Sequence, residues 1–251
     1  MNEHAPESAY VRDTYNAMLA KLPKGYSEFR WHDTDVSRFH WRQSRRTLLR
    51  GLAAVPLKVN RALEVGGGAG AWTPFFAGRA VHMDFLDISE NMLKEARVAL
   101  ERFSNITYAQ ADFLEWEPEQ AAYDLIVSIR NLEYMKDKRL ALMHLARGLR
   151  TGGTLIVSTK SPEFDWTGYF KGKKLHGGQI SICELVALLR ENGFSIVNVY
   201  PAIIGKGIRY APLRAAWDGL QILLLRLPRF LMPVSILKYI SESFLIVARR
   251  I

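Results

Sequence analysis

The sequence contains little cysteine and no signal-like segment at its start. Its 251 residues include one cysteine, Cys183, which excludes an internal disulfide and favours a reducing compartment. Within SICELVALL, Cys183 has the setting of a small core residue. The N-terminal stretch MNEHAPESAYVRD carries acids and no apolar run, unlike a signal peptide. We therefore expect a cytoplasmic chain, and its length suits one sizeable core.

Acidic residues are scarce at both ends of the chain. The net charge is +9, residues 1–60 carry ten Lys and Arg against six acids, and residues 201–251 carry eight against two. The segment between these ends is slightly acidic. Basic ends of this kind suit anionic lipid, phosphate-bearing substrates or nucleic acid as partners.

A glycine-rich turn follows a short apolar run and is the most informative stretch. Residues 61–74 read RALEVGGGAGAWTP, in which a strand-type run containing Glu64 breaks abruptly into glycines. A buried strand that leads into such a turn presents bare backbone N–H groups where a ligand can approach closely. Glycine turns also simply join strands to helices, and this pattern alone is weak evidence for a nucleotide site.

Two further acids stand at the ends of later strands. From position 81 the chain reads VHMDFLDISENML, a second strand that ends at Asp87, 23 residues after Glu64. An acid about 20 positions beyond the glycines is typical of the ligand that holds a ribose diol. A third strand is followed by Asp112 and Phe113. Three acids in this order predict an adenosine pocket.

These motifs resemble those of the class I S-adenosylmethionine-dependent methyltransferases. The family's first-strand acid and GxGxG correspond to Glu64 and the glycines, its ribose carboxylate to Asp87, and its DxSxxML form to residues 87–93. The resemblance covers roughly residues 49–200 and the last strand. It implies S-adenosyl-L-methionine as cofactor. The residues expected to bind that cofactor are Glu64, Gly66, Gly68, Gly70, Asp87, Ile88, Met92, Asp112, Phe113 and Ser128.

The acceptor substrate is expected past the fourth strand, over Arg130, Asn131 and Tyr134. Many family members carry a histidine where Tyr134 stands, so an inherited base cannot be assigned there. The candidate general bases are His176, in the KKLHGG loop after the fifth strand, and Glu133. His176 is alternatively an exposed loop residue, and Glu133 alternatively pairs with Arg130 or the lid. No metal site is expected.

The alternation of strands and helices predicts a doubly wound α/β fold with a mostly parallel sheet. The resemblance implies a seven-stranded, Rossmann-like sheet whose antiparallel last strand, SFLIVARR, lies between the fifth and sixth strands. We expect one methyltransferase domain over residues 1–251. Its parts are a helical lid over 1–55 with helices at Ala9–Leu22 and Arg42–Val55, a cofactor-binding core over 56–200, an apolar basic insert over 201–243 and the last strand over 244–251.

The insert before the last strand combines basic and large apolar residues. Arg226, Arg229 and Lys238 interrupt its apolar runs before the roughly 18 residues that a membrane span requires. Residues 212–240 therefore suit peripheral contact with a membrane surface or a cover over an apolar substrate channel. The alternatives are a helical hairpin packed on the domain and a homodimer interface, so a monomer and a homodimer both remain open.

The leading hypothesis is methyl transfer from S-adenosylmethionine to a small molecule, with a lipid, isoprenoid or lipid-linked acceptor preferred. Alternatives are a soluble metabolite or natural product as acceptor, and a non-catalytic S-adenosylmethionine-binding partner protein. A nicotinamide dehydrogenase is disfavoured by the stretch over 87–93. Nucleic acid is disfavoured as substrate because SIRNLEY stands where base methyltransferases normally carry an Asn/Asp-Pro-Pro-aromatic run.

Overall fold

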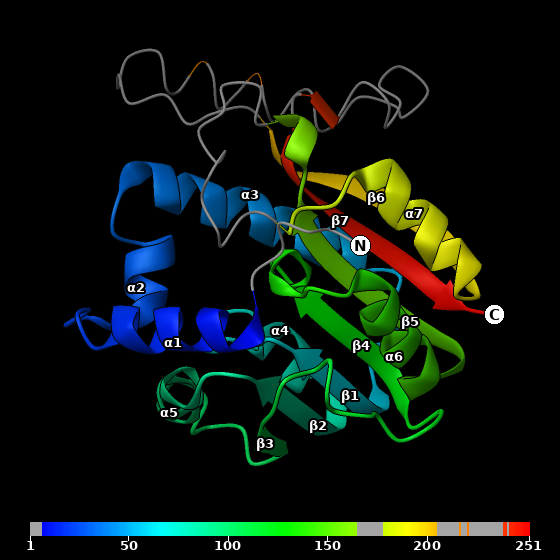
Figure 1. Cartoon of the computed structure of the whole chain (residues 1–251), viewed down its shortest axis with the longest axis horizontal. Helices are drawn as coiled ribbons and strands as arrows, with labels where there is room; N and C mark the ends of the chain where they lie inside the picture. Colours follow the sequence, from blue (N-terminus) through cyan, green and yellow to red (C-terminus); the bar gives the residue numbers. More distant parts are fainter. Residues whose placement is uncertain (1–6, 165–177, 205–215, 217–219, 221–237, 240) are drawn as a thin grey trace.

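The protein has a seven-stranded mixed sheet at its centre (Figure 1). The computed structural model describes residues 7–164, 178–204, 216, 220, 238–239 and 241–251. The strand order is β3-β2-β1-β4-β5-β7-β6. The strands are β1 (Val59–Val65), β2 (Ala80–Asp87), β3 (Ile106–Gln110), β4 (Tyr123–Ile129), β5 (Leu149–Lys160), β6 (Phe194–Ile204) and β7 (Ser241–Arg250).

Strand direction confirms the predicted fold class. The pairs among β1 to β5 are all parallel, whereas β7 runs antiparallel to both β5 and β6. The last strand thus lies between the fifth and sixth, as expected, although it begins at Ser241 rather than at residue 244. Strand β4, YDLIVSI, is buried along almost its whole length. A parallel strand covered on both faces reads as such a continuous apolar run.

Helices cover both faces of the sheet. On one face, α6 (Lys138–Gly148) and α7 (Ile182–Glu191) pack on Leu63, Ile126 and Leu155. On the other face, α3 (Asp35–Leu52) and α4 (Pro74–Ala77) pack on Ala62 and Leu125. The remaining helices are α1 (Ser8–Leu19), α2 (Gly25–Trp31), α5 (Glu90–Ala99) and the 3₁₀ turns η1 (Leu132–Tyr134) and η2 (Pro162–Phe164).

The N-terminal lid contains more helix than the sequence predicted. Helix α3 begins at Asp35, seven residues before the expected start at Arg42, because Thr34 and Ser37 form a capping box. The Ser37 amide donates to Thr34 Oγ1 at 3.0 Å, and the Thr34 amide donates to Ser37 Oγ at 2.8 Å. A capping box of this kind satisfies two N–H groups that a helix start leaves without partners.

Two further sequence expectations concern Cys183 and residues 212–240. Cys183 is exposed on α7, so its assignment as a core residue was wrong. The buried face of that helix is instead made by Ile182, Leu185 and Leu189. The membrane-contact prediction for residues 212–240 falls mostly outside the described residues. Within the described part of the chain, no helix is long and apolar enough to cross a membrane.

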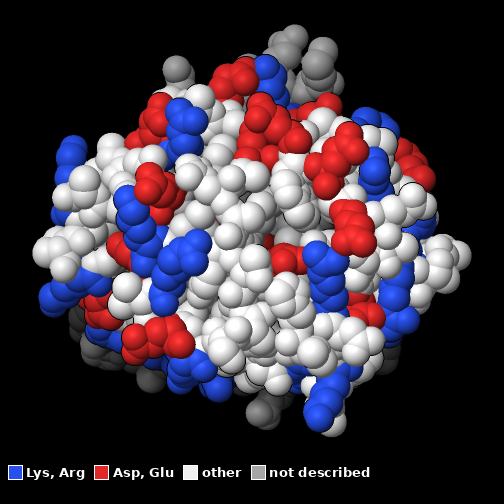
Figure 2. Space-filling model, turned by 90° about the horizontal axis from the view of Figure 1, so that it is seen from below, with Lys and Arg blue, Asp and Glu red and all other residues white. Residues whose placement is uncertain are grey.

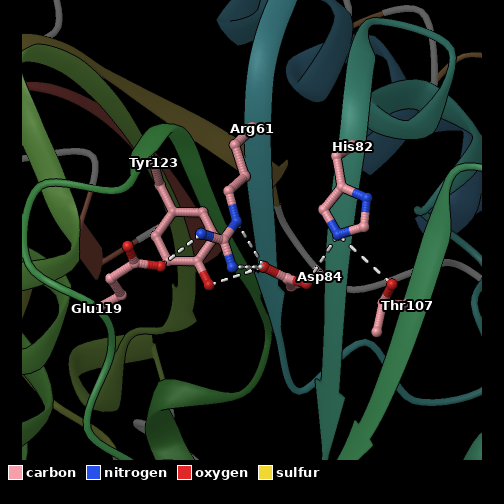
Figure 3. Close-up of polar contacts among 6 residues, drawn as sticks. All are labelled: Arg61, His82, Asp84, Thr107, Glu119 and Tyr123. Atoms are coloured by element: carbon pink, nitrogen blue, oxygen red, sulfur yellow. Dashed lines mark hydrogen bonds and ion pairs between the residues drawn. The ribbon is translucent and has the colours of Figure 1, made fainter.

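The β1–β3 part of the sheet carries a polar network on the α6 and α7 face (Figure 3). Arg61 pairs with Asp84 at 2.9 Å and with Glu119 at 2.7 Å, while the Tyr123 hydroxyl donates to Asp84 at 2.8 Å. Figure 2 views the molecule from the side of α5 and β3, where acidic and basic side chains are intermingled around an uncharged middle. This view therefore shows no continuous basic patch.

Candidate cofactor and acceptor site

The turn after β1 forms the floor of a cavity at the C-terminal ends of the central strands. Gly66, Gly67 and Gly68 all line it. A Cβ on Gly66 would lie 2.1 Å from the Asn131 side chain, and one on Gly67 would lie 2.3 Å from the Phe85 ring. At Gly68, whose φ is +59°, a Cβ would meet only the Met92 sulfur, at 4.0 Å. Glycine therefore leaves bare backbone against the cavity, as a bound cofactor requires.

Asp87 stands at the end of β2 and lines the same cavity. One carboxylate oxygen accepts from the Gly68 amide at 2.8 Å, and the other accepts from the Ser89 amide at 2.9 Å. Burial raises the pKa of Asp87 to about 6, although the same amides oppose this rise. Each carboxylate oxygen has a second lone pair, so the group can still accept from a ribose diol.

The cavity continues along the residues expected at the adenine. Ile88, Met92, Asp112 and Phe113 line it. Asp112 accepts from the Leu114 amide at 2.9 Å, which fixes the turn after β3. Phe113 belongs to the α6 and α7 core, so its ring is held rigidly as part of the wall. The described geometry thus brings these four predicted cofactor residues together.

Three predicted cofactor residues lie behind the cavity wall instead. Glu64 is 1% exposed, and burial raises its pKa to about 8. A Cβ on Gly70 would lie 2.7 Å from a methyl carbon of Leu100, so this glycine permits close packing behind the turn. Ser128 is buried in β4, and its hydroxyl has no hydrogen-bond partner among the described residues. None of the three lines the cavity.

The residues expected at the acceptor line the same cavity. Arg130, Asn131 and Tyr134 follow β4 and all contact it. The Tyr134 ring packs edge-on against Tyr15 of α1 at 5.7 Å, and Tyr15 packs likewise against Tyr26 of α2 at 5.8 Å. Burial raises the pKa values of these tyrosines, so their hydroxyls are protonated at neutral pH. Helices α1 and α2 of the lid thus meet the turn after β4 through a tyrosine cluster.

Glu133, the described candidate base, is fully buried and already paired. Arg130 Nε donates to one of its oxygens at 2.9 Å, and Thr159 Oγ1 donates to the other at 3.2 Å. Glu133 does not line the cavity. This arrangement is the pairing that the sequence left open as the alternative to catalysis. The other candidate, His176, lies outside the described residues, so its role stays a prediction.

Arg30 is a charged lining residue that the sequence did not predict. It belongs to α2, contacts the cavity, and places its guanidinium carbon 4.0 Å from the centre of the Trp31 ring. Its only sequence signal is a basic residue within the aromatic stretch after the first helix. Among the described residues, no cluster of three or more His, Cys, Asp or Glu could hold a metal ion.

Comparison with known proteins agrees with this geometry. A family model described as a methyltransferase domain matches residues 62–153. The ubiquinone biosynthesis O-methyltransferase of Xylella fastidiosa is 30% identical over 176 residues, which cover 64% of this chain and 68% of that protein. The chain belongs to the class I S-adenosylmethionine-dependent methyltransferases. S-adenosylmethionine is the cofactor of this methyltransferase family, and the glycine floor with Asp87 fits it.

Other relatives match over shorter spans. The malonyl-[acyl-carrier protein] O-methyltransferase of a Paenibacillus species is 33% identical over 119 residues, which cover 45% of this chain and 42% of that protein. An uncharacterized methyltransferase of Mycobacterium bovis is 35% identical over 109 residues, which cover 43% of this chain and 54% of that protein. The methyltransferase chain thus spans about half the length of these relatives.

Solved structures share the methyltransferase fold. The N-methyltransferase NodS of Bradyrhizobium japonicum, in complex with S-adenosyl-L-homocysteine, matches with a TM-score of 0.62 at 18% identity, covering 94% of this chain and 98% of that one. The [4+2]-cyclase SpnF matches with a TM-score of 0.63 at 19% identity, covering 98% and 97%. At these identities the likeness shows the fold alone, and a fold does not fix the chemistry.

Proposed function

We propose that the protein transfers a methyl group from S-adenosylmethionine to a small-molecule acceptor. The observation that carries this proposal is one continuous cavity. Its lining includes the glycine turn and Asp87, and also Arg130 and Tyr134 after β4. A donor site and an acceptor site in one cavity allow direct transfer between two aligned ligands.

The residues of the chain act mainly by positioning in this proposal. When bound, the cofactor supplies a methyl group already activated by its sulfonium. Asp87 holds the ribose, Asp112 receives the adenine amine, and the backbone of 66–68 contacts the methionine part. The tyrosine cluster closes the lid over the acceptor and excludes water, which strengthens electrostatic interactions in the cavity.

A lipid, isoprenoid or lipid-linked acceptor remains the preferred class. Its support is the basic, apolar sequence of residues 212–240 and the similarity to a protein named for ubiquinone biosynthesis. Contact with a membrane surface and a cytoplasmic location belong to the same proposal. A soluble acceptor and a non-catalytic cofactor-binding role are the competing proposals.

Titration calorimetry with S-adenosylhomocysteine tests the cofactor site. Asp87→Ala removes the acceptor for both ribose hydroxyls, so we expect binding to weaken by about 1–3 kcal/mol. The matched control is Glu90→Gln, which removes an exposed carboxylate three residues further along. Unchanged affinity in a variant that still melts cooperatively would show that Asp87 does not hold the ribose.

A labelling assay then separates catalysis from binding alone. S-adenosylmethionine with a labelled methyl group is incubated with the protein and either a lipid extract or an aqueous metabolite extract. Label that enters the lipid fraction, and is lost with Asp87→Ala, supports the preferred acceptor class. Label in the aqueous fraction favours a soluble acceptor. Intact cofactor binding with no transfer in either extract favours the non-catalytic role.

A further inference from the structure

A buried arginine at the acceptor end has a donor without a partner. Arg130 follows β4 with a φ of +57°, and its side chain is 12% exposed. Its Nε donates to Glu133 at 2.9 Å, and its Nη2 lies 3.8 Å from Glu242. Its Nη1 is buried and has no hydrogen-bond acceptor among the described residues. Leaving such a donor unpaired costs free energy, which an acceptor atom on a ligand would recover.

A second guanidinium lines the same cavity. Arg30 lines the cavity from the lid, and no carboxylate of the described chain forms an ion pair with it. Burial raises the pKa of Tyr26, and Arg30 and Arg130 both oppose that rise. Arg30, Arg130 and Tyr26 all line the cavity, Arg30 from the lid and Arg130 from the end of β4.

Further charged groups surround these two arginines. Burial alone would raise the pKa of Glu242, but the neighbouring groups lower this pKa to about 2. In decreasing order of effect, these groups are Lys160, Arg130, His40 and Arg30. Burial lowers the pKa of His40, which makes it neutral at pH 7. The described groups that act here are thus three cations, Arg30, Arg130 and Lys160, and three carboxylates, Asp87, Glu133 and Glu242. Asp87 accepts from two backbone amides, while Glu133 and Glu242 lie against Nε and Nη2 of Arg130, so none of the three occupies Nη1.

Two guanidiniums line one cavity, and among the described residues neither Arg30 nor Nη1 of Arg130 has a carboxylate partner, which favours an anionic ligand. Removing charge from water is costly unless an opposite charge accompanies it. Guanidinium groups present their donors in a planar fork that matches a carboxylate. The carboxylate of the cofactor's own methionine part could also meet these donors, so an experiment must distinguish the two.

We infer that the acceptor carries a carboxylate, which binds Nη1 of Arg130 and the guanidinium of Arg30 next to Tyr134. This inference rests on the proposed methyltransferase function and narrows its acceptor class. It leaves open which atom of the acceptor receives the methyl group. The carboxylate, held by the lid and by the β4 end together, would contribute to closing the lid.

The test is calorimetric binding of small probes to the protein saturated with S-adenosylhomocysteine. The probes are acetate, malonate, decanoate and its neutral counterpart methyl decanoate, with decyl phosphate as the competing anion. We expect at least one carboxylate to bind, and decanoate to bind at least tenfold more tightly than methyl decanoate. Equal binding of decanoate and its ester, or no binding by any carboxylate, would overturn the inference.

Arg130→Lys is the decisive variant because it keeps a cation beside Glu133 and Glu242 while removing the planar fork. We expect carboxylate affinity to fall at least tenfold and the dissociation constant of S-adenosylhomocysteine to stay within twofold. Arg30→Gln should likewise weaken carboxylate binding. Lys24→Gln, which removes an exposed lid charge, is the matched control and should change neither affinity.

Three results would contradict the assignment. If both arginine variants weaken cofactor binding as much as probe binding, the arginines hold the cofactor's carboxylate instead. If decyl phosphate binds more tightly than decanoate, the acceptor group is a phosphate. If only Arg130→Lys affects the probe, Arg30 has no part in the site. Failure of the wild-type protein to bind S-adenosylhomocysteine would instead refute the proposed function itself.

Discussion

Glu64 is a carboxyl group enclosed in the strand that leads to the glycine turn. Burial raises its pKa to about 8, and Thr73 only partly opposes this. Between pH 4.5 and 8 the folded protein therefore holds a proton that the unfolded chain has released. The contribution of protonated Glu64 to the free energy of unfolding is fully present below pH 4.5 and is lost as the pH rises through about 8.

Glu64→Gln should remove this pH dependence, because glutamine keeps the shape without a proton to lose. We expect the variant to gain stability over the wild type as the pH rises from 5 to 8, by on the order of a few kcal/mol. Urea unfolding at both pH values measures the difference. Glu90→Gln, on the surface, is the control, and parallel wild-type and Glu64→Gln curves would contradict the raised pKa.

Gly66 and Gly152 share a left-handed backbone but differ in their surroundings. Their φ values are +68° and +77°, yet a Cβ on Gly66 would lie 2.1 Å from Asn131 while one on Gly152 would meet nothing within 4 Å. Gly152→Ala should lower the free energy of unfolding by about 1–2 kcal/mol through backbone strain alone. Gly66→Ala should lower it by roughly a further 1–3 kcal/mol through overpacking, and should also weaken S-adenosylhomocysteine binding.

Denaturant unfolding and calorimetry of the two alanine variants check this prediction. Equal losses of stability would show that Asn131 moves aside without cost. The comparison also shows what a sequence can reveal at this scale. The place of Gly66 and Asp87 at the cavity could be predicted from their spacing in the motif. The pairing of Glu133 with Arg130 could be named only as one alternative, since it depends on how η1 turns back after β4.

The lid helices are attached to α5 by two polar contacts. Ser89 Oγ donates to Asn16 Oδ1 at 2.6 Å, and the Tyr26 amide donates to Glu95 at 2.9 Å. Glu95→Ala removes the acceptor for that amide at the edge of the domain. We expect faster release of S-adenosylhomocysteine, by roughly 3- to 10-fold for a loss of about 1 kcal/mol, because the lid is held less firmly.

Stopped-flow displacement measures this release rate, and thermal unfolding monitors the fold. Glu101→Ala, also an acid on the surface but beyond the end of α5, is the matched control. An unchanged release rate in Glu95→Ala would show that the tyrosine cluster alone holds the lid. A large drop in melting temperature would assign Glu95 to the stability of the domain instead.

At the scale of elements, periodicity located most helices and strands of the core. The start of α3 was missed because its capping box uses Ser37 at the position where glutamate or glutamine usually signals a helix start. The role of the lid in the site could likewise be predicted only in part. Its apolar spacing predicted helix α1, but the meeting of Tyr15 with Tyr134 joins segments far apart in the chain.

At the scale of the whole molecule, strand order was predictable because the alternation and the family resemblance agree on it. The polar network of Figure 3 was not. Arg61 and Glu119 are 58 residues apart, and each alone reads as an ordinary surface charge. In the folded protein, Arg61 and Glu119 form a hydrogen-bonded network with Asp84 and Tyr123. A sheet face covered by a helix would be expected to carry apolar side chains at such positions.

The position of β7 has a consequence for how the protein is made. Strands β5 and β6 do not pair with each other, since β7 lies between them. During synthesis on the ribosome, β1 to β5 can pair as they emerge, but β6 has no neighbour in the sheet until residues 241–250 have been translated. Nascent chains therefore present an open strand edge late in their production, and this edge is a site for chaperone capture or aggregation.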